Sequence, residues 1–201
     1  MKDADCTLPP YIVHDIGQIE TLSQNANWAI TDLEIPELWK DTEGEGVTVA
    51  IIDTGVPDHV DLNDNIILDK CRSFIDGEDM WDKSVGHGSH VGGLVAALNN
   101  TYGVVGVAPK AKLVCLKALN QYGSSKGASI ERALNYCLEF KPDIINMSLG
   151  GPVEMTAAHE IIKKLYAQNI IMVCSAGNNG QTNDASVLYP AKYDEVFAVG
   201  S

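Results

Sequence analysis

Short apolar runs alternate with segments of helical periodicity along most of the chain. Residues 47–52 form a continuous apolar run that ends at Asp53-Thr54-Gly55, which predicts a buried strand leading into a turn. Residues 128–140 repeat apolar side chains on one face at 3.6-residue spacing, which predicts a helix. The same patterns predict a helix over 91–98 and another that begins near Thr156, which could act as its cap. They also predict strands over 113–119, 143–147, 170–175 and 196–199.

The alternation of strands and helices predicts an α/β fold. Repeated strand–helix–strand units imply a three-layer sandwich, with a mainly parallel central sheet and helices on both faces. Residues 1–22 lack clear periodicity and are interpreted as an N-terminal extension, and residues 23–201 as the folded domain. Proteins with such a sheet bind their ligands beyond the carboxyl ends of the strands. Asp53, Ser148 and Asn178 come just after predicted strands, so we expect the chemistry there.

Charge and cysteine content narrow the classes of function. The 201 residues carry a net charge of -13 and have a sequence pI of about 4.6, which disfavours nucleic acids and anionic membrane surfaces as partners. No run approaches the roughly 20 apolar residues that span a bilayer, and the polar, acidic N-terminus is unlike a secretory signal. The 5 cysteines lack paired spacing and indicate reduced thiols. We therefore expect a cytoplasmic protein.

Three polar residues at the ends of predicted elements could carry a reaction. His87 opens a helix, whose N-terminus favours a neutral imidazole that can act as a base. An ionised Asp53 at its other ring nitrogen would fix the tautomer, and the Asn178 amide could donate to an oxyanion. Plainer interpretations remain open: Asp53 and Asn178 as turn residues, and His87 as a core histidine. His87 and His90, together with Asp53, also leave open a metal-dependent hydrolase.

Four motifs are far more specific together than each is alone. The chain resembles the subtilisin-like serine peptidases in motifs that occur in the family's order, namely Asp53-Thr54-Gly55, His87-Gly88-Ser89-His90-Val91, Asn146-Met147-Ser148-Leu149-Gly150-Gly151 and Ala176-Gly177-Asn178. The resemblance extends from Trp28 to Ser201. It implies the three-layer fold and a serine endopeptidase that acts on polypeptide substrates.

The resemblance assigns a role to individual residues. Asp53 orients His87, which acts first as general base and then as general acid, and Asn178 donates to the oxyanion. Substrate binding is implied for an edge backbone, which pairs with an extended peptide, and for the segments around the first specificity pocket: Ser148, Leu149, Gly150, Gly123, Ala176 and Gly177. A cis peptide bond is implied at Tyr189-Pro190, with Leu188 setting the bulk of the pocket.

A structural calcium site is also implied by the resemblance. Its side-chain ligands are Gln24, Asp61 and Asn100, and its backbone carbonyl ligands are those of Leu98, Tyr102 and Val104. Hard oxygen donors with a single carboxylate suit calcium better than zinc. An ordinary Asn/Gly loop is the alternative interpretation. The stretch between Asp53 and Asp61 is one residue shorter than the commonest family pattern.

The N-terminal extension carries a further point of similarity. Leu8-Pro9-Pro10-Tyr11 resembles a tag near the N-terminus of intracellular subtilisins, in which a short extension lies across the cleft and its proline prevents productive cleavage. The second residue is Pro9 rather than the usual isoleucine. We therefore expect residues 1–22 to act as a short inhibitory propeptide, with a disordered tail as the alternative.

The resemblance breaks at the nucleophile. The family's serine lies in a Gly-Thr-Ser-Met-like turn that follows the aspartate and the histidine in the chain, and Ser89, Ser148 and Ser201 do not match that turn. We expect the serine to lie beyond residue 201 and the 201-residue chain alone to be inactive. A split enzyme completed by a C-terminal chain, a homodimer and a non-catalytic peptide-binding module stay open. Without the serine helix, residues 47–52 and 170–173 should expose apolar surface.

Overall fold

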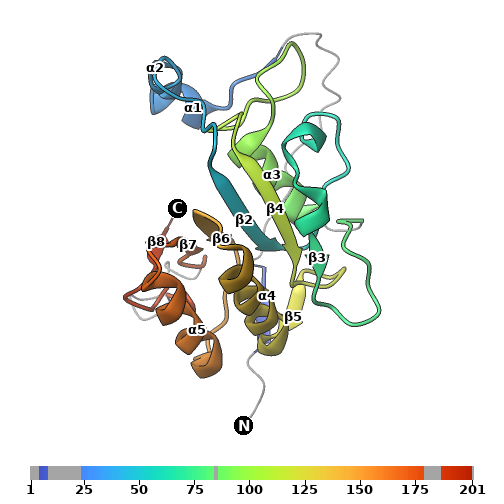
Figure 1. Ribbon diagram of the computed structural model, residues 1–201, viewed down its shortest axis with the longest axis vertical. Coiled ribbons are helices and arrows are strands. Elements are labelled where there is room, and N and C mark those ends of the chain that lie inside the picture. Colours follow the sequence, from blue (N-terminus) through green and yellow to red (C-terminus); the bar gives the residue numbers. More distant parts are fainter. Residues whose placement is uncertain (1–4, 9–23, 84–85, 179–186, 201) are drawn as a thin grey trace.

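A six-stranded, all-parallel sheet forms the centre of the computed structural model (Figure 1). The structure describes residues 5–8, 24–83, 86–178 and 187–200. The sheet has the order β3-β4-β2-β6-β7-β8. Its strands are β2 (Thr48–Asp53), β3 (Arg72–Ser73), β4 (Lys112–Lys117), β6 (Ile144–Met147), β7 (Ile171–Ser175) and β8 (Phe197–Val199). The parallel α/β architecture predicted from the sequence is therefore confirmed.

Helices lie on both faces of the sheet (Figure 1). The longest, α4, packs beside α5 on one face, and α3 lies on the other. The helices are α1 (Trp28–Asp32), α2 (Ile35–Leu38), α3 (His87–Ala96), α4 (Gly127–Phe140) and α5 (Thr156–Tyr166), with short 3-10 turns at Asn63–Asn65 and Leu68–Lys70. None of the helices in the described part of the chain is long and apolar enough to cross a membrane.

The two central strands are buried on both faces, which explains their unbroken apolar runs. In β2, Ala50 and Ile52 point into the core shared with α4 and α5, whereas Val49 and Ile51 point into the core shared with α3. Each fully buried isoleucine contributes about 1.5–3 kcal/mol of hydrophobic stabilisation. The expectation that residues 47–52 would expose apolar surface holds only at the start of this run, where Val47 is half-buried and lines an apolar groove. Neighbouring strands and helices on both faces cover the rest of it.

The strands at the other side of the sheet are covered less evenly. Residues of β6 and β7 that face α4 and α5 are buried, whereas on the opposite side Ile171 is 48% exposed and Val173 is half-buried. Val173 and Ile144 line an apolar groove of about 500 Å³ that continues to Leu94 on α3. The predicted exposure of residues 170–173 therefore occurs on one face of β7. All of β8 is exposed.

A three-residue strand lies within the segment interpreted as an extension. β1 (Asp5–Thr7) pairs antiparallel with β5 (Ser124–Lys126), and Thr7 also bridges to Gly150. The hydrophobic pattern did not predict β1, because three residues are too few to show a period of two. Its partners lie more than a hundred positions away along the chain.

The starts of two helices were also predicted. α3 begins at His87, as expected, although its apolar pattern starts four residues later because glycines and polar residues fill the first turn. Thr156 is the first residue of α5 and does not cap it; the cap position is Met155, without a side-chain hydrogen bond to the helix.

All 5 cysteines are buried and reduced. Burial raises the pKa of the Cys6 thiol and of the Cys174 thiol to about 12, and it raises the pKa of Cys137 as well. A thiol with such a pKa stays protonated near neutral pH and reacts slowly, because the thiolate is the nucleophilic form.

We predict that iodoacetamide at about pH 8 leaves Cys137 and Cys174 unmodified in the folded protein and alkylates both after denaturation in guanidinium. Mass spectrometry of tryptic peptides measures the modification at each site. Rapid alkylation of Cys174 without denaturant would show that the strand end around it opens readily.

Candidate active site

Asp53, the last residue of β2, is a buried carboxylate with a complete set of donors. Its two carboxylate oxygens lie 2.8 and 2.9 Å from Nδ1 of His87, and the backbone N–H of Thr54 donates to Oδ1 at 2.7 Å. The side chain is fully buried, so these bonds replace the water that a carboxylate otherwise requires. The structure thus brings together the two residues expected to form a dyad.

The start of α3 can approach β2 this closely because of a glycine. A Cβ at Gly88 would lie 2.9 Å from the backbone oxygen of Gly55 and 3.1 Å from Thr54 Oγ1. The same approach lets the Gly88 N–H donate to Thr54 Oγ1 at 2.8 Å. A larger residue at position 88 would push the helix, and His87 with it, away from Asp53.

Asp82 holds the first turn of α3 from a second side. Its carboxylate accepts from the backbone N–H of Gly86 at 3.1 Å and of Ser89 at 2.9 Å, and from the Ser89 hydroxyl at 2.8 Å. A carboxylate at this end of a helix also interacts favourably with the helix dipole. Asp82 was missed from the sequence, because it reaches the helix from outside the usual cap position.

The ring of His87 has a defined tautomer in this setting. An ionised carboxylate only accepts hydrogen bonds, so Nδ1 of His87 carries the proton and donates to Asp53. The other nitrogen, Nε2, then has the basic lone pair. The side chain is 17% exposed, which leaves the ring accessible at the rim of the site. This arrangement can accept a proton from a hydroxyl and stabilise the imidazolium that results.

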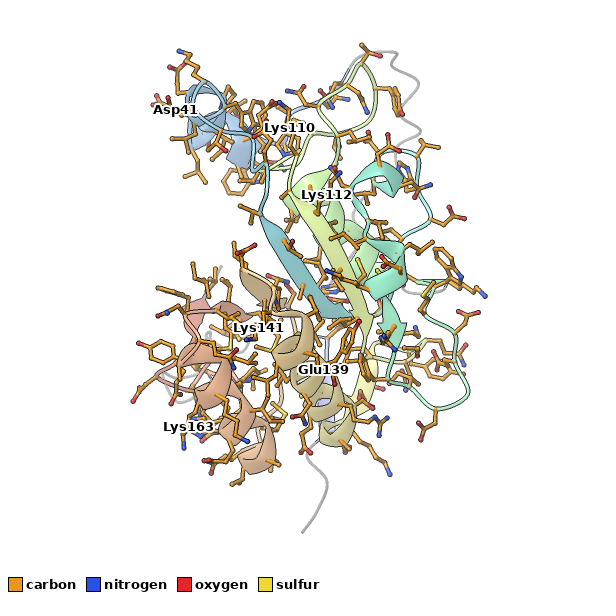
Figure 2. The ribbon with its side chains drawn as sticks, in the orientation of Figure 1. Asp41, Lys110, Lys112, Glu139, Lys141 and Lys163 are labelled. Carbon is orange, nitrogen blue, oxygen red and sulfur yellow. The ribbon has the colours of Figure 1, made fainter. Side chains whose placement is uncertain are left out.

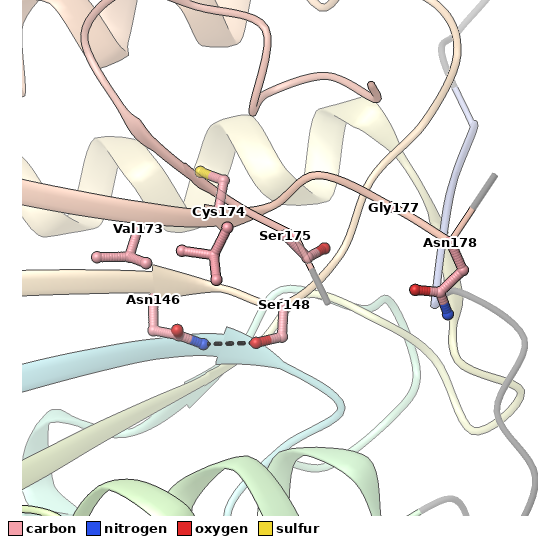
Figure 3. Close-up of a pocket in the computed structure, with 9 residues that line it drawn as sticks. Asn146, Ser148, Val173, Cys174, Ser175, Gly177 and Asn178 are labelled. Atoms are coloured by element: carbon pink, nitrogen blue, oxygen red, sulfur yellow. Dashed lines mark hydrogen bonds between the residues drawn. The ribbon is translucent and has the colours of Figure 1, made fainter. Parts of the chain in front are cut away.

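A second part of the site lies at the carboxyl ends of β6 and β7. A pocket of about 240 Å³ opens there, and Figure 3 shows Ser148 and Ser175 along it with Asn178 at its end. Asn146 donates from Nδ2 to the Ser148 hydroxyl at 2.9 Å. The described lining of this pocket contains neither Asp53 nor His87. Asn178 therefore lies just beyond the expected strand end, on a pocket whose described lining does not include the dyad.

Cys174 lines the same pocket but is a poor nucleophile. Its pKa of about 12 keeps the thiol protonated near neutral pH. The pocket thus offers hydroxyl and amide groups rather than a thiolate.

The segments expected to hold a substrate flank the N-terminal strand. Gly150 exchanges two backbone hydrogen bonds with Thr7, at 3.1 and 3.3 Å, and the Leu8 N–H donates to the Gly123 carbonyl at 2.9 Å. Leu149 is fully buried, and its carbonyl accepts from the Ser175 hydroxyl at 3.4 Å.

Leu188 lies where a specificity pocket was expected. A Cβ on Gly150 or Gly177 would lie 2.8 or 2.9 Å from its side chain, so Leu188 packs directly on both glycines. Ala176 joins β8 through a bond from its N–H to the Val199 carbonyl at 2.8 Å. The Tyr189-Pro190 bond is cis, as expected.

The alternative metal centre finds little support. His90 lies on a different cavity from the dyad, beside His59 and Leu94. Within the described ranges, no group of three or more His, Cys, Asp and Glu side chains is placed to hold a metal ion.

The six residues expected to bind calcium gather in one place. Gln24 Nε2 donates to the Leu98 carbonyl at 2.6 Å and lies 3.3 Å from the Val104 carbonyl. Asn100 donates to Asp61 Oδ1 at 2.6 Å and accepts from the backbone N–H of Tyr102 at 2.9 Å.

The chemistry of this cluster suits a hard cation. Asp61 is 2% exposed, and its recorded partners are the neutral N–H donors of Asn100 and Val104. Calcium prefers carboxylate, amide and carbonyl oxygens, and this cluster contains all three kinds of oxygen. For Gln24 to be a ligand, its amide would have to turn so that the oxygen, rather than the nitrogen, points inward.

Comparison with known proteins gives consistent matches. The chain is 44% identical to an intracellular serine protease of Paenibacillus polymyxa, over 84% of this chain and 53% of the relative. It is 37% identical to the major intracellular serine protease of Bacillus subtilis, over 99% of this chain and 64% of the relative. It is 44% identical to subtilisin DY of Bacillus licheniformis, over 79% of this chain and 57% of the relative. It thus spans between half and two thirds of these relatives' lengths.

A family model described as the subtilase family matches residues 44–201, which include Asp53, His87 and Asn178. Together with these identities, that match shows that the chain belongs to the subtilase family.

Proposed function

We propose that the whole protein containing these residues is a serine endopeptidase in which Asp53 and His87 activate a serine outside residues 1–201. The observation that carries the proposal is the pair of contacts, at 2.8 and 2.9 Å, between His87 Nδ1 and the Asp53 carboxylate. The relatives named above are described as serine proteases or as a subtilisin, and they are longer than this chain.

In the proposed reaction, His87 Nε2 accepts the proton of the serine hydroxyl as its oxygen attacks the peptide carbonyl. Asp53 stabilises the imidazolium, which then gives its proton to the leaving amine. Water enters next, and His87 repeats both transfers to release the acyl group. Asn178 donates to the oxyanion, since its amide lies at the end of β7.

The described serines near the site have other partners. Ser89 donates to Asp82, the Ser148 hydroxyl accepts from Asn146, and Ser175 donates to the Leu149 carbonyl. The partly exposed face of β7 lines an apolar groove of about 500 Å³. A helix that carries the nucleophilic serine could pack in this groove.

The N-terminal strand supports a proposal of autoinhibition. Thr7 pairs with both the N–H and the carbonyl of Gly150, and Leu8 donates to the carbonyl of Gly123, which are groups that an extended polypeptide substrate would otherwise use. Pro9, Pro10 and Tyr11 of the expected tag lie outside the described residues.

Two further parts of the proposal rest on the same comparisons and contacts. The oxygen-rich cluster around Asp61 supports one structural calcium ion, held by Gln24, Asp61, Asn100 and the carbonyls of Leu98, Tyr102 and Val104. A cytoplasmic location is supported by two relatives that are named as intracellular proteases.

We expect Asp53→Asn in the whole protein to lower kcat on a chromogenic peptide by about 10⁴-fold, the loss established for this substitution in serine peptidases. The neutral amide would favour the wrong imidazole tautomer. Asp41→Asn, an exposed acidic residue beside α2 (Figure 2), is the matched control and should keep full activity.

A fluorophosphonate probe locates the nucleophile in the same protein. It should label a serine outside residues 1–201, and the 201-residue chain alone should remain unlabelled and inactive. Labelling of Ser89, Ser148 or Ser175, lost in His87→Ala, would contradict the proposal.

For calcium, we expect saturation to raise the melting temperature of the whole protein, because a ligand that binds only the folded state adds about 2.7 kcal/mol at 100 times its Kd. Asp61→Asn should abolish the rise, whereas Asp64→Asn, an exposed neighbour, should keep it. Differential scanning calorimetry with calcium and with a chelator provides the measurement. Superimposable melts of the parent protein would rule out the site.

For autoinhibition, deletion of residues 1–20 from the whole protein should increase the initial rate of peptide hydrolysis. Thr7→Pro should increase it less, because proline removes only the N–H that donates to Gly150. A synthetic peptide of residues 1–12 should inhibit the deleted protein in trans. A deletion variant with unchanged activity and an unchanged melting temperature would argue against an inhibitory strand.

A further inference from the structure

A buried lysine lies next to the catalytic aspartate without being part of the proposed triad. Lys117 is the last residue of β4 and is directly opposite Asp53 in the parallel β2–β4 register. Its side chain is only 4% exposed. Burial of an ammonium group is costly unless the charge is paired and hydrogen-bonded, so this side chain needs an explanation beyond packing.

The contacts of Lys117 lead to both members of the dyad. Its Nζ donates to the Thr54 carbonyl at 2.5 Å. Thr54 in turn donates its backbone N–H to Asp53 Oδ1 at 2.7 Å and accepts from the Gly88 N–H through its hydroxyl at 2.8 Å. One residue, Thr54, therefore connects the ammonium group to the aspartate and to the turn of α3 that carries His87.

The other ionisable groups around this position are mainly acidic. Glu78, which is 27% exposed, lies 3.3 Å from Nζ of Lys117. Asp79 accepts a hydrogen bond from Lys83, which lowers the pKa of the Asp79 carboxyl. The positive charge of Lys117 lowers the same pKa by a smaller amount. Asp82 caps α3. Of the basic groups near the dyad in the described ranges, Lys117 is the deeply buried one, whereas Lys83 is largely exposed.

We propose that Lys117 is a positioning residue for the Asp53–His87 pair. Through Thr54 it fixes the direction of the Asp53 carboxylate and the first turn of α3, and it places a buried positive charge beside the pair. The inference rests on the proposed function, in which His87 is the general base.

The test compares Lys117→Met, Lys117→Arg and Glu78→Gln in the whole protein. We expect Lys117→Met to raise the midpoint of the acid limb of kcat/KM by about one pH unit, because a nearby positive charge is lost. Glu78→Gln removes a negative charge and should lower the midpoint. Lys117→Arg keeps the charge and should leave the midpoint close to that of the parent.

A matched control separates this role from a structural one. Lys112, at the opposite end of β4 (Figure 2), is exposed and donates to the Asp64 carbonyl at 2.8 Å. Lys112→Met should leave the midpoint unchanged. A structural lysine would lower only the melting temperature, so an unchanged midpoint in Lys117→Met, or shifts of the same sign in Lys117→Met and Glu78→Gln, would overturn the proposal.

A second readout does not require activity. The pH titration of the His87 ring can be followed by proton NMR in the same proteins, with the same opposite shifts expected. If the parent protein does not hydrolyse peptides, the proposed function fails, while the NMR midpoints still decide whether Lys117 acts on His87. If Lys117→Met does not fold, Glu78→Gln and Lys117→Arg provide the comparison.

Discussion

The Gly88 N–H donates a hydrogen bond to Thr54 Oγ1, and this bond fixes the first turn of α3 against the end of β2. Helix and strand can come this close only because position 88 lacks a Cβ. The distance between His87 and Asp53 follows from that approach. Two charged side chains add to this contact between helix and strand. Asp82 accepts from the Ser89 N–H in the first turn of α3, and Lys117 donates to the Thr54 carbonyl at the end of β2.

The two halves of the sheet differ in how they are stabilised. Around β2 and β4, alternate side chains enter two separate cores, so the strand that carries Asp53 is held from both faces. Around β6 to β8, burial is strong on the side of α4 and α5 and weaker on the other. The dyad thus rests on the more firmly packed half, whereas Asn178 follows a strand of the less completely covered half.

Much of this could be predicted from the sequence. Continuous apolar runs identified the central strands, because parallel strands are buried on both faces. The placement of Asp53, His87 and Asn178 at element ends followed from the motifs. β1 could not be predicted, since its pairing depends on distant residues. The roles of Asp82 and Lys117 could not be predicted either. Asp82 reaches the helix from outside the cap position, and Lys117 simply ends an apolar run, so neither residue has a local sequence signal.

The attachment of β1 to the rest of the chain has a kinetic consequence. Residues 9–23 join it covalently to Gln24, so the pairing of Thr7 with Gly150, and of the adjacent Leu8 with Gly123, is intramolecular. A short tether gives such a segment an effective concentration on the order of millimolar. A few backbone hydrogen bonds can then compete with free peptides that are far more dilute. A single cut within residues 9–23 would remove that advantage, because the released segment would dilute into the surrounding solution and could not return at the same rate.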